Sequence, residues 1–154
     1  MKSTYGYSIQ TNVDEDGFIH AQTVTPGNAH DGTECDTLLL GDEVALYADA
    51  AYSSRATLKK LESFGIKDKV QRKGYRGHPL SAADLIRNDK IAVTRSGGER
   101  PFTTYKSRYR LARTRLIGLV RNMIFYGQAV IVHNIQNGAK FLLLYGLLEA
   151  KQVG

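Results

Sequence analysis

Two carboxylates stand where this chain could perform metal-assisted chemistry. Asp49 directly follows an almost continuously apolar segment, Val44–Ala48, which is typical of a buried strand. Glu99 comes fifty residues later, with Arg95 four residues before it and Lys106 seven residues after it. Carboxylate oxygens suit Mg²⁺, and the nearby cations suit a phosphodiester. Such a site normally needs a third carboxylate, and the sequence offers no convincing one.

Each of these residues also has a simpler explanation. Asp49 would serve equally well as a helix cap or as an exposed surface acid. Glu99 lies at a predicted helix start, where the helix dipole favours a carboxylate. The spacing of Arg95, Glu99 and Lys106 is also typical of an ordinary helix that is stabilised by salt bridges. The residue pattern alone leaves both interpretations open.

A dense run of cations follows Glu99. If one long helix begins at Glu99 or Pro101, then Glu99 shares a face with Lys106, Arg110 and Arg113. Arginine makes bidentate phosphate contacts, and the interleaved tyrosines can stack or donate hydrogen bonds. This pattern predicts a phosphate-binding track, although a solvated helix face is the alternative. Six cations fall within sixteen residues: Lys106, Arg108, Arg110, Arg113, Arg115 and Arg121.

The charge is divided unevenly along the chain. Residues 1–50 hold one basic and nine acidic residues, and residues 51–154 hold 20 basic and six acidic ones, so the net charge of +6 combines −8 with +14. A basic half suggests a polyanionic partner, with a solvated basic surface as the alternative. The single cysteine, Cys35, excludes an internal disulfide and a cysteine zinc site.

Length and hydropathy narrow the class of protein further. With 154 residues, 42% of them apolar, the chain is long enough for one domain with a substantial core. No apolar stretch approaches the length of a membrane span, and the polar residues after Met1 do not resemble a signal peptide. We therefore expect a cytoplasmic protein without a membrane partner.

The periodicity predicts an α/β protein. Alternating and continuously apolar segments predict strands over 5–13, 18–24, 44–49 and 66–70, the first two forming a hairpin at Gly17. Caps and apolar spacing predict helices over 31–40 (capped by Asp31), from Ser53 or Ser54 through Phe64 to a stop at Gly65, over 81–87, from 99 or 101 onward, and again after Gly138. The basic, glycine-bearing segment Gln71–His78 is predicted to be a mobile loop.

Four segments, covering about residues 5–135, together match the residue types and spacings of one known family. They are Tyr5–Asp14 with Gly17–His20 and Val24–Asp31; Tyr47–Tyr52; Arg95–Lys106; and Arg113–Asn122. In this combination they resemble the DDE transposases of bacterial insertion sequences. The family's last motif places an arginine four residues before its catalytic glutamate and a lysine seven after it, and both spacings hold around Glu99. The tyrosine that the motif places three residues before Arg95 is replaced by Ala92.

The resemblance implies an incomplete ribonuclease-H-like fold, with a mixed sheet that lacks its first strand and is flanked by helices. The predicted strand order corresponds to the family's fold from its second strand onward. Asp49 then corresponds to the second catalytic aspartate and Glu99 to the glutamate, while the first aspartate would precede Met1. Asp14 cannot replace it, because Asp14 ends a strand at a hairpin turn. Residues 1–136 would form a partial catalytic domain, and 137–154 a C-terminal helical tail.

The chemistry implied by the resemblance is DNA transposition by metal-dependent phosphoryl transfer. Asp49 and Glu99 would hold Mg²⁺ or Mn²⁺, in a site where two ions normally lie about 3.5–4 Å apart. With one carboxylate missing, we expect this two-ion site to be incomplete. Arg95, Lys106, Arg110 and Arg113 would bind the DNA of the transposon ends.

Three hypotheses follow. The chain is an N-terminally truncated transposase with little activity alone, or a non-catalytic DNA-binding remnant that interferes with an intact transposase. A homodimer, or association with an intact transposase, would suit either. The third is a basic RNA-associated protein, in which Asp49 and Glu99 would not share a site.

Overall fold

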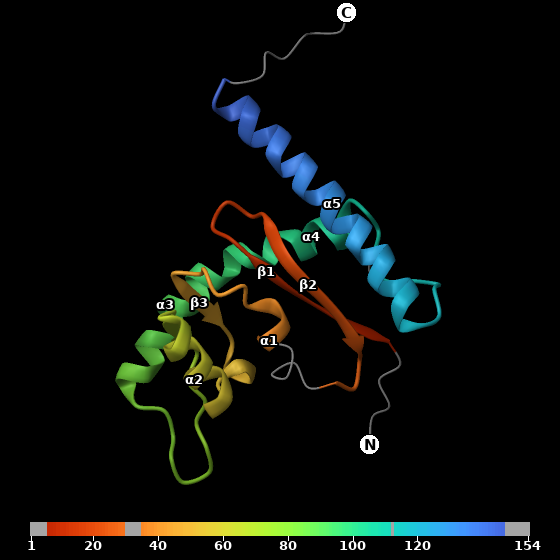
Figure 1. Ribbon diagram of the computed structural model, residues 1–154. Coiled ribbons are helices and arrows are strands. Elements are labelled where there is room, and N and C mark those ends of the chain that lie inside the picture. Colours follow the sequence, from red (N-terminus) through yellow and green to blue (C-terminus); the bar gives the residue numbers. More distant parts are fainter. Residues whose placement is uncertain (1–5, 30–34, 112, 147–154) are drawn as a thin grey trace, which may run out of the picture.

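The computed structural model describes residues 6–29, 35–111 and 113–146, and these form an α/β arrangement (Figure 1). The α/β class is thus confirmed, while the predicted cap Asp31 lies outside the described residues. The elements are β1 (Tyr7–Val13), β2 (Ile19–Pro26), α1 (Cys35–Leu38), β3 (Ala45–Ala48), η2 (Ala50–Tyr52), α2 (Arg55–Phe64), β4 (Lys67–Val70), α3 (Ala82–Ser96), η3 (Gly97–Glu99), α4 (Arg100–Ser107) and α5 (Leu119–Leu144).

β1 and β2 form the predicted antiparallel hairpin. Ile9 lies opposite Val24, and a bulge separates Asn12 from Val13. Gly17 has φ +85° in the connecting turn, a conformation that glycine adopts without steric cost. The core beneath this hairpin joins it to the helices that follow, and its buried members are Ile19, Tyr105 and Ala129.

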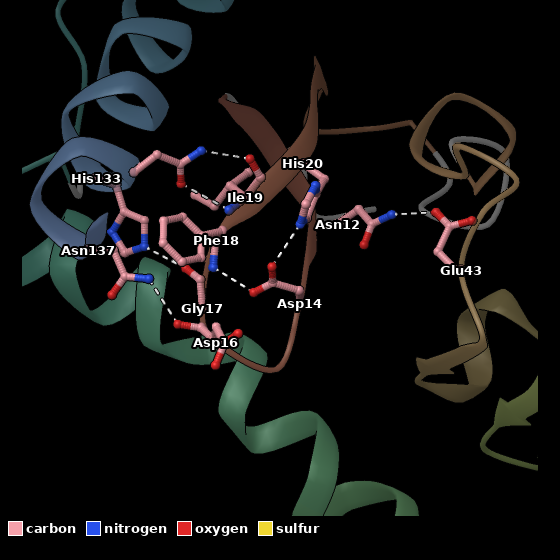
Figure 2. Close-up of polar contacts among 11 residues, drawn as sticks. Asn12, Asp14, Asp16, Gly17, Phe18, Ile19, His20, Glu43, His133 and Asn137 are labelled. Atoms are coloured by element: carbon pink, nitrogen blue, oxygen red, sulfur yellow. Dashed lines mark hydrogen bonds and ion pairs between the residues drawn. The ribbon is translucent and has the colours of Figure 1, made fainter. Parts of the chain in front are cut away.

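The long helix α5 covers the outer edge of β2 (Figure 2). Asn134 accepts a hydrogen bond from the Ile19 amide at 2.9 Å and donates one to the Ile19 carbonyl at 2.8 Å. His133 donates to the Gly17 carbonyl at 3.0 Å, and Asn137 donates to the Asp16 carbonyl at 2.9 Å. Polar side chains of a helix therefore satisfy backbone groups that a neighbouring strand would otherwise pair.

β3 and β4 form a second, parallel pair in which Ala48 lies opposite Val70. Helix α2 packs against this pair, and Leu61, Ile66 and Val70 belong to a separate buried cluster. Of the two predicted caps, Ser53 and Ser54, the structure uses Ser54, whose side chain accepts from the Thr57 amide. The predicted end of α2 at Gly65 is confirmed, with φ +70°.

The expected single mixed sheet is instead two separate two-stranded sheets. Within the described ranges, β1 pairs only with β2 and β3 only with β4. The apolar sequence of β3 predicts a central strand, yet Val44 just before it is 74% exposed and Tyr47 within it is 40% exposed. The reason is that β3 lacks a neighbour on its second edge. β1 is the hairpin strand nearer to β3 in Figure 1.

The limits of two helices, α3 and α4, differ from the prediction. α3 reaches Ser96 rather than Arg87. The long helix expected from Glu99 ends at Ser107, because Arg110 adopts φ +53° and the Leu111 amide donates to the Tyr105 carbonyl at 2.8 Å. This turn carries Leu111 onto the hairpin core.

The separate helix expected after Gly138 is the continuation of α5, which runs unbroken to Leu144. Across the described residues, α5 included, no helix combines the length and apolar character that a membrane span requires.

Candidate active site

Asp49 lies at the carboxyl end of β3, as its sequence position predicts. Its side chain caps η2, with Oδ1 accepting from the Ala51 amide at 2.8 Å. The capping role suggested by the sequence is therefore real, but it uses only one carboxylate oxygen. The parallel partner β4 ends at the same edge, where the Gln71 amide donates to the Ala48 carbonyl at 2.9 Å. Asp49 thus stands at the kind of sheet edge where α/β proteins bind ligands.

Arg95 brings the two candidate acids together. Its Nη1 lies 3.9 Å from Oδ2 of Asp49, and its Nη2 lies 3.3 Å from Oε1 of Glu99. The second contact is local, because residues four apart meet on one helix face. The first joins residues distant in sequence and depends on the packing of α3 against β3. Two carboxylates fifty residues apart therefore share one guanidinium.

The position of α3 follows from its two ends. Ser81 caps it in a reciprocal capping box with Asp84, which starts the helix at a defined residue. Arg87 then donates from Nη1 to the Val70 carbonyl at 2.6 Å, fastening α3 to the end of β4. Two turns further along, this orientation carries Arg95 to Asp49.

Glu99 lies in η3, the short turn between α3 and α4, and its side chain is 60% exposed. Lys106 lies seven residues later in the last turn of α4, and is exposed. Because seven residues correspond to nearly two full helical turns, Lys106 projects from about the same side of the chain as Glu99.

Arg110 and Arg113 do not share that face. α4 ends at Ser107, so both arginines lie in the connection to α5, where both are exposed. The expectation that Glu99, Lys106, Arg110 and Arg113 form one helical row is wrong. The chain turns after Ser107 because Leu111 is held against the hairpin core.

The Arg95 guanidinium is only partly used by its two acids. Its Nε is buried and has no hydrogen-bond partner among the described residues. A buried donor without a partner is costly, so Nε is available to a further acceptor. Tyr105, in the adjoining helix α4, is unsuited to acid–base work because burial and the neighbouring Tyr109 phenol raise its pKa well above the ordinary value.

A divalent metal fits this site in chemical type. Asp49 and Glu99 offer carboxylate oxygens, the donors that Mg²⁺ prefers. They are two ligands rather than three, and in the described part of the chain no cluster of three or more His, Cys, Asp or Glu side chains has the geometry of a metal site. The donor set is therefore of the right kind but short by one group.

Sequence reasoning missed the residues that connect the two sheets. Asn12 on β1 donates to Oε1 of Glu43 at 2.7 Å and to the Leu38 carbonyl at 2.9 Å (Figure 2). Burial raises the pKa of Glu43, but hydrogen bonds from Leu40, Gly41 and Asn12 outweigh it and leave that pKa below the ordinary value. No short-range pattern announces this contact, since Asn12 and Glu43 are 31 residues apart.

A second missed group surrounds Asp68 on β4. It binds Arg72 at 2.7 Å and lies 3.6 Å from Arg87. Asp68 and Arg72 are four residues apart, which is the spacing of an ion pair on a helix. Because residues 66–70 are predicted to be a strand, this spacing does not predict the ion pair.

Comparisons with known proteins identify the family of the chain. The model of the transposase DDE domain family matches residues 1–135. A curated relative, the transposase for insertion sequence element IS1106 of Neisseria meningitidis serogroup B, is 31% identical over 118 residues. That match covers 75% of this chain and 41% of the relative, so the chain spans about two-fifths of the relative's length. No solved structure matches the chain significantly. The chain belongs to the transposase DDE domain family.

Proposed function

We propose that this chain is the part of a transposase catalytic domain that carries two of its three carboxylates, and that it acts on DNA by metal-dependent phosphoryl transfer. The observation that carries the proposal is the meeting of Asp49 and Glu99 on the Arg95 guanidinium. It also disfavours the hypothesis of a basic RNA-associated protein, because that hypothesis predicts that Asp49 and Glu99 do not share a site.

Each residue has a distinct task in this proposal. Asp49 and Glu99 would hold Mg²⁺ or Mn²⁺, which when bound activates a water or a 3′-hydroxyl and stabilises the leaving oxygen. Arg95 and Lys106 would position the phosphate beside them. Arg110 and Arg113, exposed on the connection between α4 and α5, would bind DNA further along.

The third carboxylate would arrive on a strand that is not among those of the described residues. We place that strand between β1 and β3, which would join the two pairs into one ribonuclease-H-like mixed sheet. Support comes from the unpaired edges of both strands and from the exposed apolar side chains of Val44 and Tyr47. The buried, unpartnered Arg95 Nε and the Thr11 Oγ1 on β1 are further groups that an added strand would satisfy.

A cleavage assay with complementation tests this proposal. The chain is incubated with transposon-end DNA and Mg²⁺, with and without the IS1106 transposase residues outside the match, supplied as a separate polypeptide. We expect little or no cleavage by the chain alone and Mg²⁺-dependent cleavage after complementation. The complementing polypeptide alone is the matched control. Absence of cleavage from a complex that demonstrably forms would contradict the catalytic role.

One observation favours a second candidate. Because only two carboxylates gather in the described residues, the chain would bind DNA without cutting it. It would then be a remnant that interferes with an intact transposase by occupying DNA ends or by pairing with that protein. Metal-independent DNA binding with a steep salt dependence, together with inhibition of an intact transposase, would favour this alternative.

A further inference from the structure

The connection between β4 and α3 forms a compact basic projection. In Figure 1 it is the yellow-green loop that extends from the β3–β4 sheet on the side away from α5. Tyr75 and His78 exchange backbone hydrogen bonds of 3.0 and 2.9 Å, closing a two-residue turn in which Gly77 has φ +84°. The segment predicted as a loop therefore contains a closed turn, and its mobility stays a prediction. We call residues 73–78 the basic turn.

The base of this turn is fastened to α3. The Arg72 amide donates to Oδ1 of Asn88 at 2.8 Å, and Nδ2 of Asn88 donates back to the Arg72 carbonyl at 3.0 Å. The Arg72 guanidinium is held by Asp68 at 2.7 Å. Arg72 therefore has a structural partner, and the position of the turn relative to α3 is defined.

The cations at the tip have no such partner. Lys73 and Arg76 are exposed, and neither forms an ion pair with any residue that the structure describes. The Tyr75 ring between them is 66% exposed. Residues 71–80 include no acid. Two free cations flanking an exposed ring are suited to a nucleic acid, because the cations can bind phosphates while the ring packs on a sugar or base.

The turn is also connected to the candidate active site. The Gln71 amide donates to the Ala48 carbonyl, so the segment leaves the sheet beside Asp49. Its other end leads into α3, whose last turn carries Arg95. The 15 residues of α3 separate the two regions by roughly 20 Å, which corresponds to about six base pairs of duplex DNA. A duplex of ordinary length is therefore long enough to span both.

We propose that the basic turn is a second DNA contact, in which Lys73 and Arg76 bind backbone phosphates and Tyr75 packs against the nucleotide between them. Its relation to the cleaved phosphate rests on the function proposed above. The binding itself does not, because it requires neither the metal nor the third carboxylate.

Metal-free binding to a 20-base-pair duplex, measured over a range of salt concentrations, tests the two cations. For Lys73→Ala with Arg76→Ala, we expect the slope of log K against log salt to fall by about two. The matched control is Lys59→Ala with Lys67→Ala, which removes two exposed cations from α2 and from the far end of β4. An equal loss in both double variants would mean that only net charge matters and would overturn the proposal, as would an unchanged slope in the turn variant.

Tyr75 is tested with two substitutions in the same assay. We expect Tyr75→Ala to weaken duplex binding and Tyr75→Phe to retain most of it, because phenylalanine keeps the ring that packs on the sugar. Since all three turn side chains are exposed, thermal unfolding should confirm an intact fold. Equal binding by both Tyr75 variants and the unaltered protein would refute the stacking role. Failure of Mg²⁺-dependent cleavage after complementation, with these binding effects present, would instead count against the proposed function alone.

Discussion

The two sheets differ in how their edges are covered. In the hairpin, the outer edge of β2 is occupied by α5, and Asn134 satisfies both backbone groups of Ile19. In the β3–β4 pair, the second edge of β3 has no neighbour in the described ranges, and Val44 beside it is 74% exposed. The outer edge of β2 is thus covered at Ile19, whereas the edge near Asp49 has no partner in the described ranges. Unpaired strand edges are usually protected, and the added strand proposed above would protect this one.

The largest expected effect concerns the acids at the unpaired edge. In the complemented protein, Asp49→Asn should reduce the cleavage rate by more than about 100-fold, because a metal ligand contributes several kcal/mol to phosphoryl transfer. DNA affinity without metal should not fall, because the substitution removes an acid that competes with DNA for Arg95. Single-turnover cleavage and metal-free binding measure the two quantities. Glu62→Gln, at an exposed acid on α2, is the control and should cleave normally.

On the covered edge, Asn134→Ala should destabilise the fold by about 2–4 kcal/mol, because two partly buried backbone groups of Ile19 lose their partners. Asn137→Ala removes a single exposed hydrogen bond and should cost about 0.5–1 kcal/mol. Urea unfolding measures both. Equal losses would show that the β2 edge does not depend on the paired contact of Asn134.

The hydrogen bond between Asn12 on β1 and Glu43 before β3 is expected to depend on pH. Hydrogen bonds hold the pKa of Glu43 in the folded protein below its ordinary value. Glu43 therefore contributes stability at neutral pH and loses it as the pH falls through the lowered pKa. Glu43→Gln should therefore cost about 1 kcal/mol at neutral pH and progressively less in acid. Unfolding at pH 7 and pH 3.5 measures the difference. If the difference in unfolding free energy between the unaltered protein and Glu43→Gln were the same at both pH values, the lowered pKa of Glu43 would be contradicted.

The smallest effect on the chain alone is expected at the open edge itself. Val44→Thr should change stability by no more than about 0.5 kcal/mol, because the side chain is largely exposed. The same substitution should weaken association with the complementing polypeptide. Unfolding of the isolated chain and titration with that polypeptide measure the two effects. A variant that associates as tightly as the unaltered protein would place the added strand elsewhere.

Local signals in the sequence predict the elements well. Alternation predicts the hairpin, and the side chains of Ser54 and Ser81 mark the starts of α2 and α3. The break after Ser107 escaped prediction because the arginine spacing continues through it, while the cause is the burial of Leu111 against a distant hairpin. The division into two sheets was also not predicted, because it depends on contacts between distant segments. The residues of β3 alone do not show which strands lie beside it.

The candidate site divides in the same way. The Arg95–Glu99 contact follows from four-residue spacing on a helix. The Asp49–Arg95 contact spans 46 residues and depends on how α3 packs, so the residue types suggested it only through the family resemblance. The two hydrogen bonds between Asn134 and the Ile19 backbone could not be predicted from the sequence, because a single asparagine on a helix is usually solvated.

Arg95 has one positive charge and serves two acids, which has a consequence for the order of binding. In the function proposed above, a guanidinium that turns towards a DNA phosphate would leave Asp49 and Glu99 without their shared counter-ion and make them a stronger site for a cation. The converse holds by thermodynamic reciprocity, so occupation of the acids releases Arg95 for the nucleic acid. Substrate and metal should therefore each raise the affinity of the protein for the other.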